Sequence, residues 1–138
     1  MWSDQEIGFW KEYLQAHHGL DGELERLDGE FDLNIAVRVD GRLDAVLKVM
    51  RVGCGYDLVG MQVEALDHLA ATMPDLPVPR VIRRHDGAAA AAVTDLSGDG
   101  RIAWVISAID GLPLGAMRPH PAALVHEIGH TLGRMTAG

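Results

Sequence analysis

Lys48 stands in the run Val46-Leu47-Lys48-Val49, and Glu64 follows sixteen positions later. Leu47 and Val49 indicate a buried strand. A lysine between them is therefore not explained as an ordinary solvent-exposed charge. The interval to Glu64 leaves room for a strand exit, a loop and the first turns of a helix. A strand lysine that a helix glutamate holds in place can present its charge to phosphate groups. The simpler interpretation is a lysine on a half-exposed strand, and the series of residues around Lys48 favours the first interpretation.

A second group of chemically active residues lies near the other end of the sequence. His126-Glu127-Ile128-Gly129-His130 has the spacing H-E-x-x-H, which on a helix places two histidines on one face as zinc ligands, with the glutamate as general base. A catalytic zinc takes three protein ligands and a water molecule. The extended motif has a third histidine at the position that Thr136 occupies here. We therefore expect no metal site, and a zinc hydrolase that uses His126, Glu127 and His130 remains an alternative.

The composition limits the classes of protein to which this chain can belong. The sequence has 138 residues, 48% of them hydrophobic, which is enough for the core of one domain. The net charge of −8 argues against a nucleic-acid-binding surface, which needs clustered positive charge. No window approaches the ~20 apolar residues of a membrane span, and the first residues lack a secretory signal. The single Cys54 is typical of a reducing compartment, so we expect a cytoplasmic protein without nucleic-acid or membrane partners.

The hydrophobic pattern predicts three helices and a series of short strands. The helices are expected from Ser3 to about His18, over 57–73, and from Pro121 to about Met135. The strands are expected at Glu23–Leu27, Leu33–Val39, Leu43–Met50, Val81–Ile82, Ala89–Thr94 and Ile102–Ile109. Asp40-Gly41 predicts a tight hairpin turn. Consecutive hairpins favour an α+β fold, with an antiparallel sheet of about five strands and the helices packed on one side.

These segments, taken in order, resemble a known family. The resemblance rests on Leu27 to Asn34, Val46 to Val49, Glu64, Pro77-Val78-Pro79, and Trp104 to Leu114. Together they are similar to the N-terminal lobe of the aminoglycoside phosphotransferase and choline kinase-like family, with the branch that phosphorylates hydroxylysine nearest. The resemblance covers about Gly19 to Met135. It implies that residues 1–138 form a single protein-kinase-like N-lobe, in which 120–138 would open a C-terminal lobe that is missing here.

The resemblance also implies where a nucleotide would bind. The phosphates would lie under the turn that carries Gly29, Glu30, Asp32 and Asn34. Lys48 would reach the α- and β-phosphates, and Glu64 would hold Lys48 in place. Ser107 to Ile109 would form a hinge whose backbone groups bind the adenine edge. The implied cofactor is ATP with Mg²⁺, although this turn has one glycine where protein kinases have three.

The catalytic residues of that family lie in its C-terminal lobe, and no comparable loop follows Asp110-Gly111. We therefore expect the nucleotide-binding half of an ATP-dependent small-molecule phosphotransferase, with no catalytic residue in this chain and no activity in isolation. The second alternative function is a non-catalytic interaction module with a kinase-like fold. We also expect a homodimer through the C-terminal helix, or binding of a C-terminal lobe, because one face would otherwise expose apolar side chains. These are Leu112, Leu114, Met117, Leu124, Ile128 and Leu132.

Overall fold

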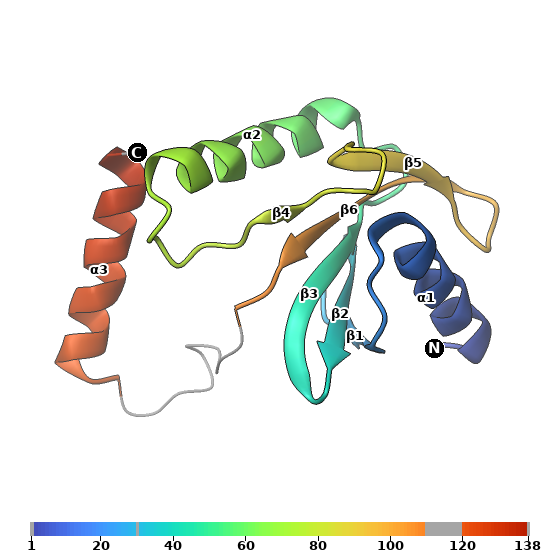
Figure 1. Cartoon of the computed structure of the whole chain (residues 1–138), viewed down its shortest axis with the longest axis horizontal. Helices are drawn as coiled ribbons and strands as arrows, with labels where there is room; N and C mark the ends of the chain where they lie inside the picture. Colours follow the sequence, from blue (N-terminus) through green and yellow to red (C-terminus); the bar gives the residue numbers. More distant parts are fainter. Residues whose placement is uncertain (1, 30, 110–119, 138) are drawn as a thin grey trace.

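The computed structural model describes residues 2–29, 31–109 and 120–137. Its helices are α1 (Asp4–His18), α2 (Tyr56–Thr72) and α3 (Ala122–Ala137). Its strands are β1 (Glu23–Leu27), β2 (Leu33–Val39), β3 (Arg42–Val49), β4 (Val81–Ile82), β5 (Ala90–Thr94) and β6 (Gly100–Ser107). The fold is α+β, as the hydrophobic pattern predicts, and Figure 1 shows the path of the chain from α1 to α3.

The strands form a six-stranded antiparallel sheet in the order β1-β2-β3-β6-β4, with β5 also paired to β6. β4 and β5 lie along one edge of β6, because Ile82 faces Val105 and Ala90 faces Trp104, the next residue along. The two short strands therefore act as one interrupted edge strand. This interruption explains why the sequence predicts about five strands and the structure has six.

The β2–β3 hairpin and a register shift between Val37 and Arg38 together set the pairing on the functional face. Asp40 and Gly41 both have left-handed backbone angles, with φ of 51° and 79°. This conformation suits a two-residue hairpin turn, whose twist matches that of the strands. The pairing places Asn34 of β2 directly opposite Lys48 of β3.

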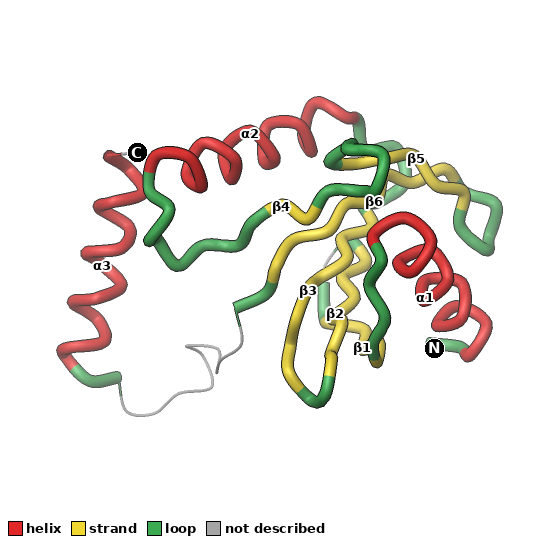
Figure 2. The backbone as a smooth tube through the Cα atoms, in the orientation of Figure 1, coloured by secondary structure: helices red, strands yellow, loops and turns green. Residues whose placement is uncertain are grey.

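The helices cover both faces of the sheet, so the prediction that they pack on one side is wrong. Trp10 and Leu14 of α1 pack on one face, and Val59 and Val63 of α2 pack on the other. The first core contains Trp10, Tyr13, Leu14, Ile35, Val37, Ala45, Leu47, Val49, Ala103 and Val105, and the second contains Met50, Val59, Val63, Ile102 and Trp104. The physical reason lies in β6, whose central residues are buried in both directions and need a cover on each face. Figure 2 shows α1 and α2 apart, with the sheet between them.

The loop between β4 and β5 docks on the last turn of α1. The backbone N–H of His85 donates to the carbonyl of His17 at 2.8 Å, and Nη1 of Arg84 donates to the Tyr13 hydroxyl at 2.8 Å. His18 is buried beside this contact, next to the backbone of Arg83. Burial lowers the pKa of His18, and the charge of Arg84 lowers it further.

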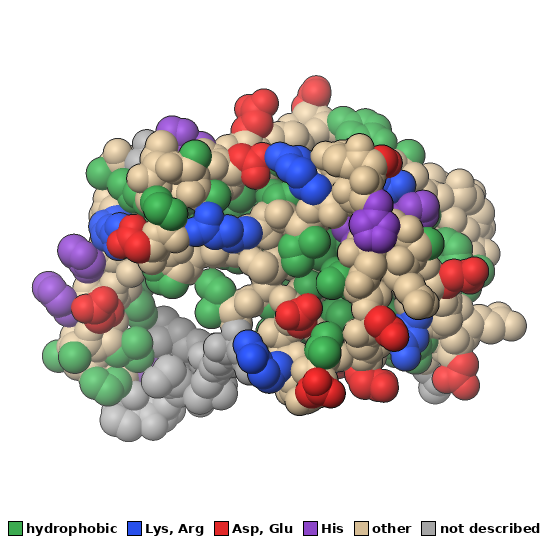
Figure 3. All heavy atoms as spheres, in the orientation of Figure 1, with side chains coloured by type: hydrophobic (Ala, Val, Ile, Leu, Met, Phe, Trp, Pro, Cys, Tyr) green, Lys and Arg blue, Asp and Glu red, His purple; other side chains and the backbone are tan. Residues whose placement is uncertain are grey.

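Helix α3 stands away from the sheet and buries none of its residues. Arg134 ties it to the segment after α2, with Nη2 at 2.8 Å from each carboxylate oxygen of Asp75. Val125 and Leu132 are each 57% exposed, and Figure 3 shows apolar side chains on the surface of α3, at the left. The other predicted apolar positions, Leu112, Leu114 and Met117, lie outside the described residues. Within the described ranges, none of the helices has the length and apolar character needed to span a bilayer.

Candidate functional site

Lys48 points to the face of the sheet on which α2 packs. The side chains of β3 alternate, so Leu47 and Val49 are buried under α1 while Lys48 lies on the opposite face, half-buried. Its Nζ donates to Oδ1 of Asn34 at 3.1 Å. No ion pair joins Lys48 to a carboxylate of any described residue. The site thus holds a partly buried cation whose hydrogen-bond partner is neutral.

The turn between β1 and β2 folds closely onto Asn34. A Cβ atom at Gly29 would lie 2.7 Å from the Asp32 carbonyl oxygen and 2.8 Å from Nδ2 of Asn34, so the turn has room only for glycine there. Oδ1 of Asp32 accepts a hydrogen bond from the Arg51 backbone N–H at 2.9 Å, which fastens the turn to the segment after β3. Gly29, Asp32, Asn34 and Lys48 are therefore brought together, as the resemblance implies. Glu30 lies outside the described residues.

Glu64 does not contact Lys48. It is exposed on α2, and no ion pair between described residues joins it to Lys48, so the predicted Lys48–Glu64 ion pair is not formed. Val59 and Val63 face the sheet, and a turn of about 100° per residue puts Glu64 about 140° around the helix from Val59. Both residues do lie on the same side of the sheet, because α2 packs on the face from which Lys48 projects.

The predicted hinge has most of its backbone donors already engaged. The N–H of Ser107 donates to the carbonyl of Arg80 at 2.7 Å, and the N–H of Ala108 donates to the carbonyl of Asp44 at 3.1 Å. Ile109 is 57% exposed. Of the three predicted hinge residues, Ile109 is the one whose backbone N–H has no hydrogen-bond partner among the described residues, so a base edge would have to be bound there.

The register of the sheet adds residues that the sequence analysis did not select. Lys48 faces Trp104 on β6 as well as Asn34 on β2, so one row of side chains crosses three strands. The next row on the same face consists of Ala36, Val46 and Ile106. These side chains are apolar and of modest size, and they lie between Lys48 and the hinge. Side chains two positions apart on a strand share a face. Counting back from Lys48 to Val46 along β3 is therefore the sequence signal that identifies this row.

The residues of the zinc motif lie together on α3. His126, Glu127 and His130 are all exposed. Across the described residues, no three histidine, cysteine, aspartate or glutamate side chains are grouped so as to hold a metal ion. The motif therefore has two histidines on one helix and lacks, in the described part of the chain, the third ligand that a catalytic zinc takes.

The arrangement on the α2 face can bind an anion and a flat apolar group side by side. Lys48 and the turn at Gly29 supply the charge and the close backbone, and the row through Val46 supplies the apolar surface. A comparison with models of known protein families finds no match for this chain, and a comparison with curated proteins finds none either. The resemblance to the aminoglycoside phosphotransferase and choline kinase-like family therefore stays a hypothesis that rests on the residues of this chain.

Proposed function

We propose that this chain is a kinase-like N-lobe, the nucleotide-binding half of an ATP-dependent small-molecule phosphotransferase. One observation carries the proposal. Lys48 is a half-buried cation without a carboxylate partner among the described residues, and it lies beside a turn in which Gly29 touches the same Asn34 that Lys48 contacts. A lysine on a strand beside a tight turn is the arrangement that phosphate groups of a nucleotide need.

The phosphates would lie on Lys48 and under the turn. Nζ of Lys48 has three donor hydrogens, and Asn34 takes one of them, so two remain for phosphate oxygens. The missing side chain at Gly29 keeps the turn close to Asn34. Mg²⁺ prefers oxygen ligands and is commonly held in part by the phosphates themselves. Since the described residues contain no metal-binding group, Mg²⁺ would be carried on the phosphates.

The adenine ring would lie on the adjacent apolar row. A purine needs a flat apolar surface and a few placed polar groups at its edge. Val46 and Ile106, which are half-buried, supply the surface, and Ile109 supplies backbone groups at the hinge side. The row lies one step of the side-chain alternation, ~7 Å, from the row of Lys48.

The chain binds and positions a nucleotide and does not by itself transfer a phosphoryl group. Transfer requires a residue that orients the acceptor and ligands for the metal, which in the family lie in the C-terminal lobe. Glu64 enters the site only if α2 rotates about its axis, which contact with a second lobe can drive. The acceptor is likewise set by that lobe.

A titration with ATP and Mg²⁺, followed by backbone amide shifts of the whole chain, tests the proposal. We expect shifts at 29–34, at Lys48 and at 106–109, with a dissociation constant of ~1 mM because half a cleft leaves the nucleotide partly solvated. Lys48→Met should remove the shifts at 29–34, and Arg42→Gln, at the exposed β2–β3 hairpin, should leave them. Shifts absent from both the turn and the hinge would rule the proposal out.

A non-catalytic interaction module is the second candidate function. The observation in its favour is α3, which buries no residue and exposes Val125 and Leu132. A partner chain that packs on this helix would bury them. In that case the amide signals of α3 shift when the partner is added, and the amide signal of Lys48 does not shift when nucleotide is added.

A further inference from the structure

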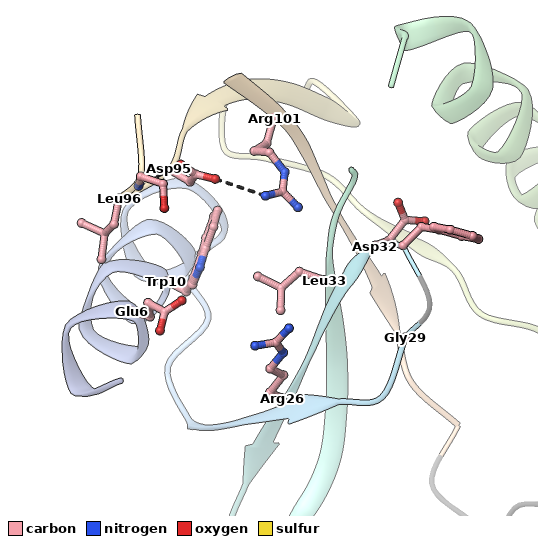
Figure 4. A pocket seen from close by; sticks show the side chains of 11 residues that line it. Glu6, Trp10, Arg26, Gly29, Asp32, Leu33, Asp95, Leu96 and Arg101 are labelled. Carbon is pink, nitrogen blue, oxygen red and sulfur yellow. Dashed lines mark hydrogen bonds and ion pairs between the residues drawn. The ribbon is translucent and has the colours of Figure 1, made fainter. Parts of the chain in front are cut away.

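A hollow of about 240 Å³ lies on the α1 face of the sheet, opposite to the face that carries Lys48. Its walls come from α1, from β1 and the β1–β2 turn, and from the β5–β6 turn with the start of β6. Figure 4 shows Arg26 and Arg101 extending toward Leu33 from opposite ends, with Glu6 reaching in from α1. The hollow lies on the other face of the sheet from Lys48, but it shares Gly29 and Asp32 of the β1–β2 turn with the proposed nucleotide site.

Most of the charges around this hollow are already neutralised. Nη1 of Arg101 pairs with Oδ2 of Asp95 at 3.1 Å, and Nε of Arg101 donates to the carbonyl of Met50 at 2.6 Å. Asp32 is engaged by Arg51. These contacts hold the walls in place and leave Nη2 of Arg101 without a hydrogen-bond partner among the described residues.

Two charges of opposite sign are left over, on opposite walls. Arg26 of β1 has no hydrogen bond or ion pair with a described residue, and Glu6 of α1 is held only by Ser3. The N–H and hydroxyl of Ser3 donate to Oε2 of Glu6 at 3.0 and 2.9 Å, and they lower the pKa of Glu6. Glu6 is therefore ionised at neutral pH. No ion pair joins it to Arg26, although the charge of Arg26 also contributes to lowering the pKa of Glu6.

Apolar side chains form part of the remaining lining, together with Ser97 and Gly29. Trp10 is 3% exposed and closes the helix side, and Leu33 is half-buried in the floor between the two arginines. Leu96, 54% exposed, stands at the rim. A ligand in the hollow would thus meet one free cation, one free anion and an apolar wall.

We propose that this hollow binds a zwitterionic α-amino acid with an apolar side chain. Its carboxylate lies against Arg26 and Nη2 of Arg101, its ammonium group lies against Glu6, and its side chain lies on Leu33 and Leu96. One cation and one anion, neither of them in an ion pair with a described residue, match a zwitterion. A simple anion such as inorganic phosphate would leave Glu6 facing a like charge. The volume is at the small end for ligand sites, which suits a free amino acid.

Three matched ligands test the charge requirement on the whole chain. L-leucine carries both charges, 4-methylpentanoate lacks the ammonium group, and L-leucinamide lacks the carboxylate. We expect leucine to shift the Trp10 indole and the amides of Arg26, Leu33 and Leu96, with a dissociation constant of ~1 mM. Each analogue should bind at least ~10-fold more weakly, because it leaves one charge of the site unpaired.

Conservative variants assign each charge to its residue. Arg26→Gln should abolish the preference for leucine over leucinamide. Glu6→Gln, which keeps a residue that can complete the helix cap, should abolish the preference for leucine over 4-methylpentanoate. Arg42→Gln is the matched control and should change neither preference, and circular dichroism should show all three variants folded.

The proposal is overturned by any of three results. The first is no shift at these residues with about 20 mM leucine, well above the expected constant. The second is 4-methylpentanoate or phosphate binding as tightly as leucine, which would make the hollow a plain anion site. The third is a folded Arg26→Gln variant that binds leucine as the unchanged chain does. Because the β1–β2 turn borders both sites, shifts at Trp10, Arg26 and Leu96 decide on the leucine site, and shifts at Lys48 and 106–109 decide on the nucleotide site.

Discussion

The two faces of the sheet differ in how much of each a helix covers. On the α1 face, Leu47 and Val105 are fully buried in a core that continues across β2, β3 and β6. On the α2 face the core is smaller and gathers around Trp104, while Lys48 and its partner Asn34 lie beside it, half-buried. The α1 face therefore contributes mainly to stability, whereas part of the α2 face is left accessible to a ligand.

Neighbouring residues on β3 make this difference testable. Leu47 and Val49 point to the α1 face and are fully buried, whereas Val46 and Lys48 point to the α2 face and are half-buried. Substitutions one position apart should therefore affect different properties of the protein.

The largest expected effect on stability is from Leu47→Ala. This change opens a cavity in the α1-face core and should lower the free energy of unfolding by about 2–5 kcal/mol. Urea unfolding followed by circular dichroism measures it. A loss below about 1 kcal/mol would mean that the α1 face is not the tightly packed one.

The next prediction concerns a substitution that should reduce nucleotide binding and leave the stability of the fold nearly unchanged. Lys48→Met keeps the apolar stem and removes the charge, so the free energy of unfolding should stay within about 1 kcal/mol of the unchanged chain. Nucleotide-induced shifts at the turn should disappear. A Lys48→Met chain that is as unstable as Leu47→Ala would show that Lys48 serves the core and would break the comparison.

The pH dependence reports on the α1 side of the molecule. Burial lowers the pKa of His18 in the folded state below the ordinary value of 6.5, so the unfolded chain binds protons more readily. Stability should be fully present above pH 6.5 and should fall as the pH drops below it, toward the lower folded pKa. Thermal unfolding at a series of pH values measures this slope.

His18→Leu removes the titrating group and should flatten the slope between pH 6.5 and the acid range. The matched control is His126→Gln, a change at an exposed histidine of α3, which should leave the slope as it is. An unchanged slope in His18→Leu would place the acid sensitivity elsewhere.

The smallest effect on folding stability is expected at α3. Leu132→Glu should leave the unfolding free energy nearly unchanged, because α3 buries none of its residues. The unchanged chain should self-associate through this helix, and the variant should be more monomeric in light scattering across a dilution series. If the unchanged chain stays monomeric at high concentration, the predicted dimer is wrong.

The sequence predicts the elements well where the pattern is local. Alternation and turn residues give the bounds of β1 and β2, and the Ser3–Glu6 capping box marks the start of α1. The choice of face for each helix is not local. It depends on how α1 and α2 cross the sheet, and the apolar content of β6 on both faces is the only sequence signal for it.

The candidate site was predictable to the same extent. The direction of Lys48 follows from its place between Leu47 and Val49, since side chains alternate along a strand. The partner that Lys48 takes does not follow, because spacing along the chain does not fix the rotation of α2. Counting from Val59 and Val63 would have placed Glu64 away from the sheet. Asn34 faces Lys48 instead, because the pairing shifts by one residue between Val37 and Arg38.

A crystal structure of the chain with Mg²⁺ and a non-hydrolysable ATP analogue tests the central claim most directly. We expect a phosphate oxygen within hydrogen-bond distance of Nζ of Lys48, and the purine on Val46 and Ile106. An analogue bound on the α1 face, or crystals grown at saturating analogue in which Lys48 keeps only its contact with Asn34, would contradict it.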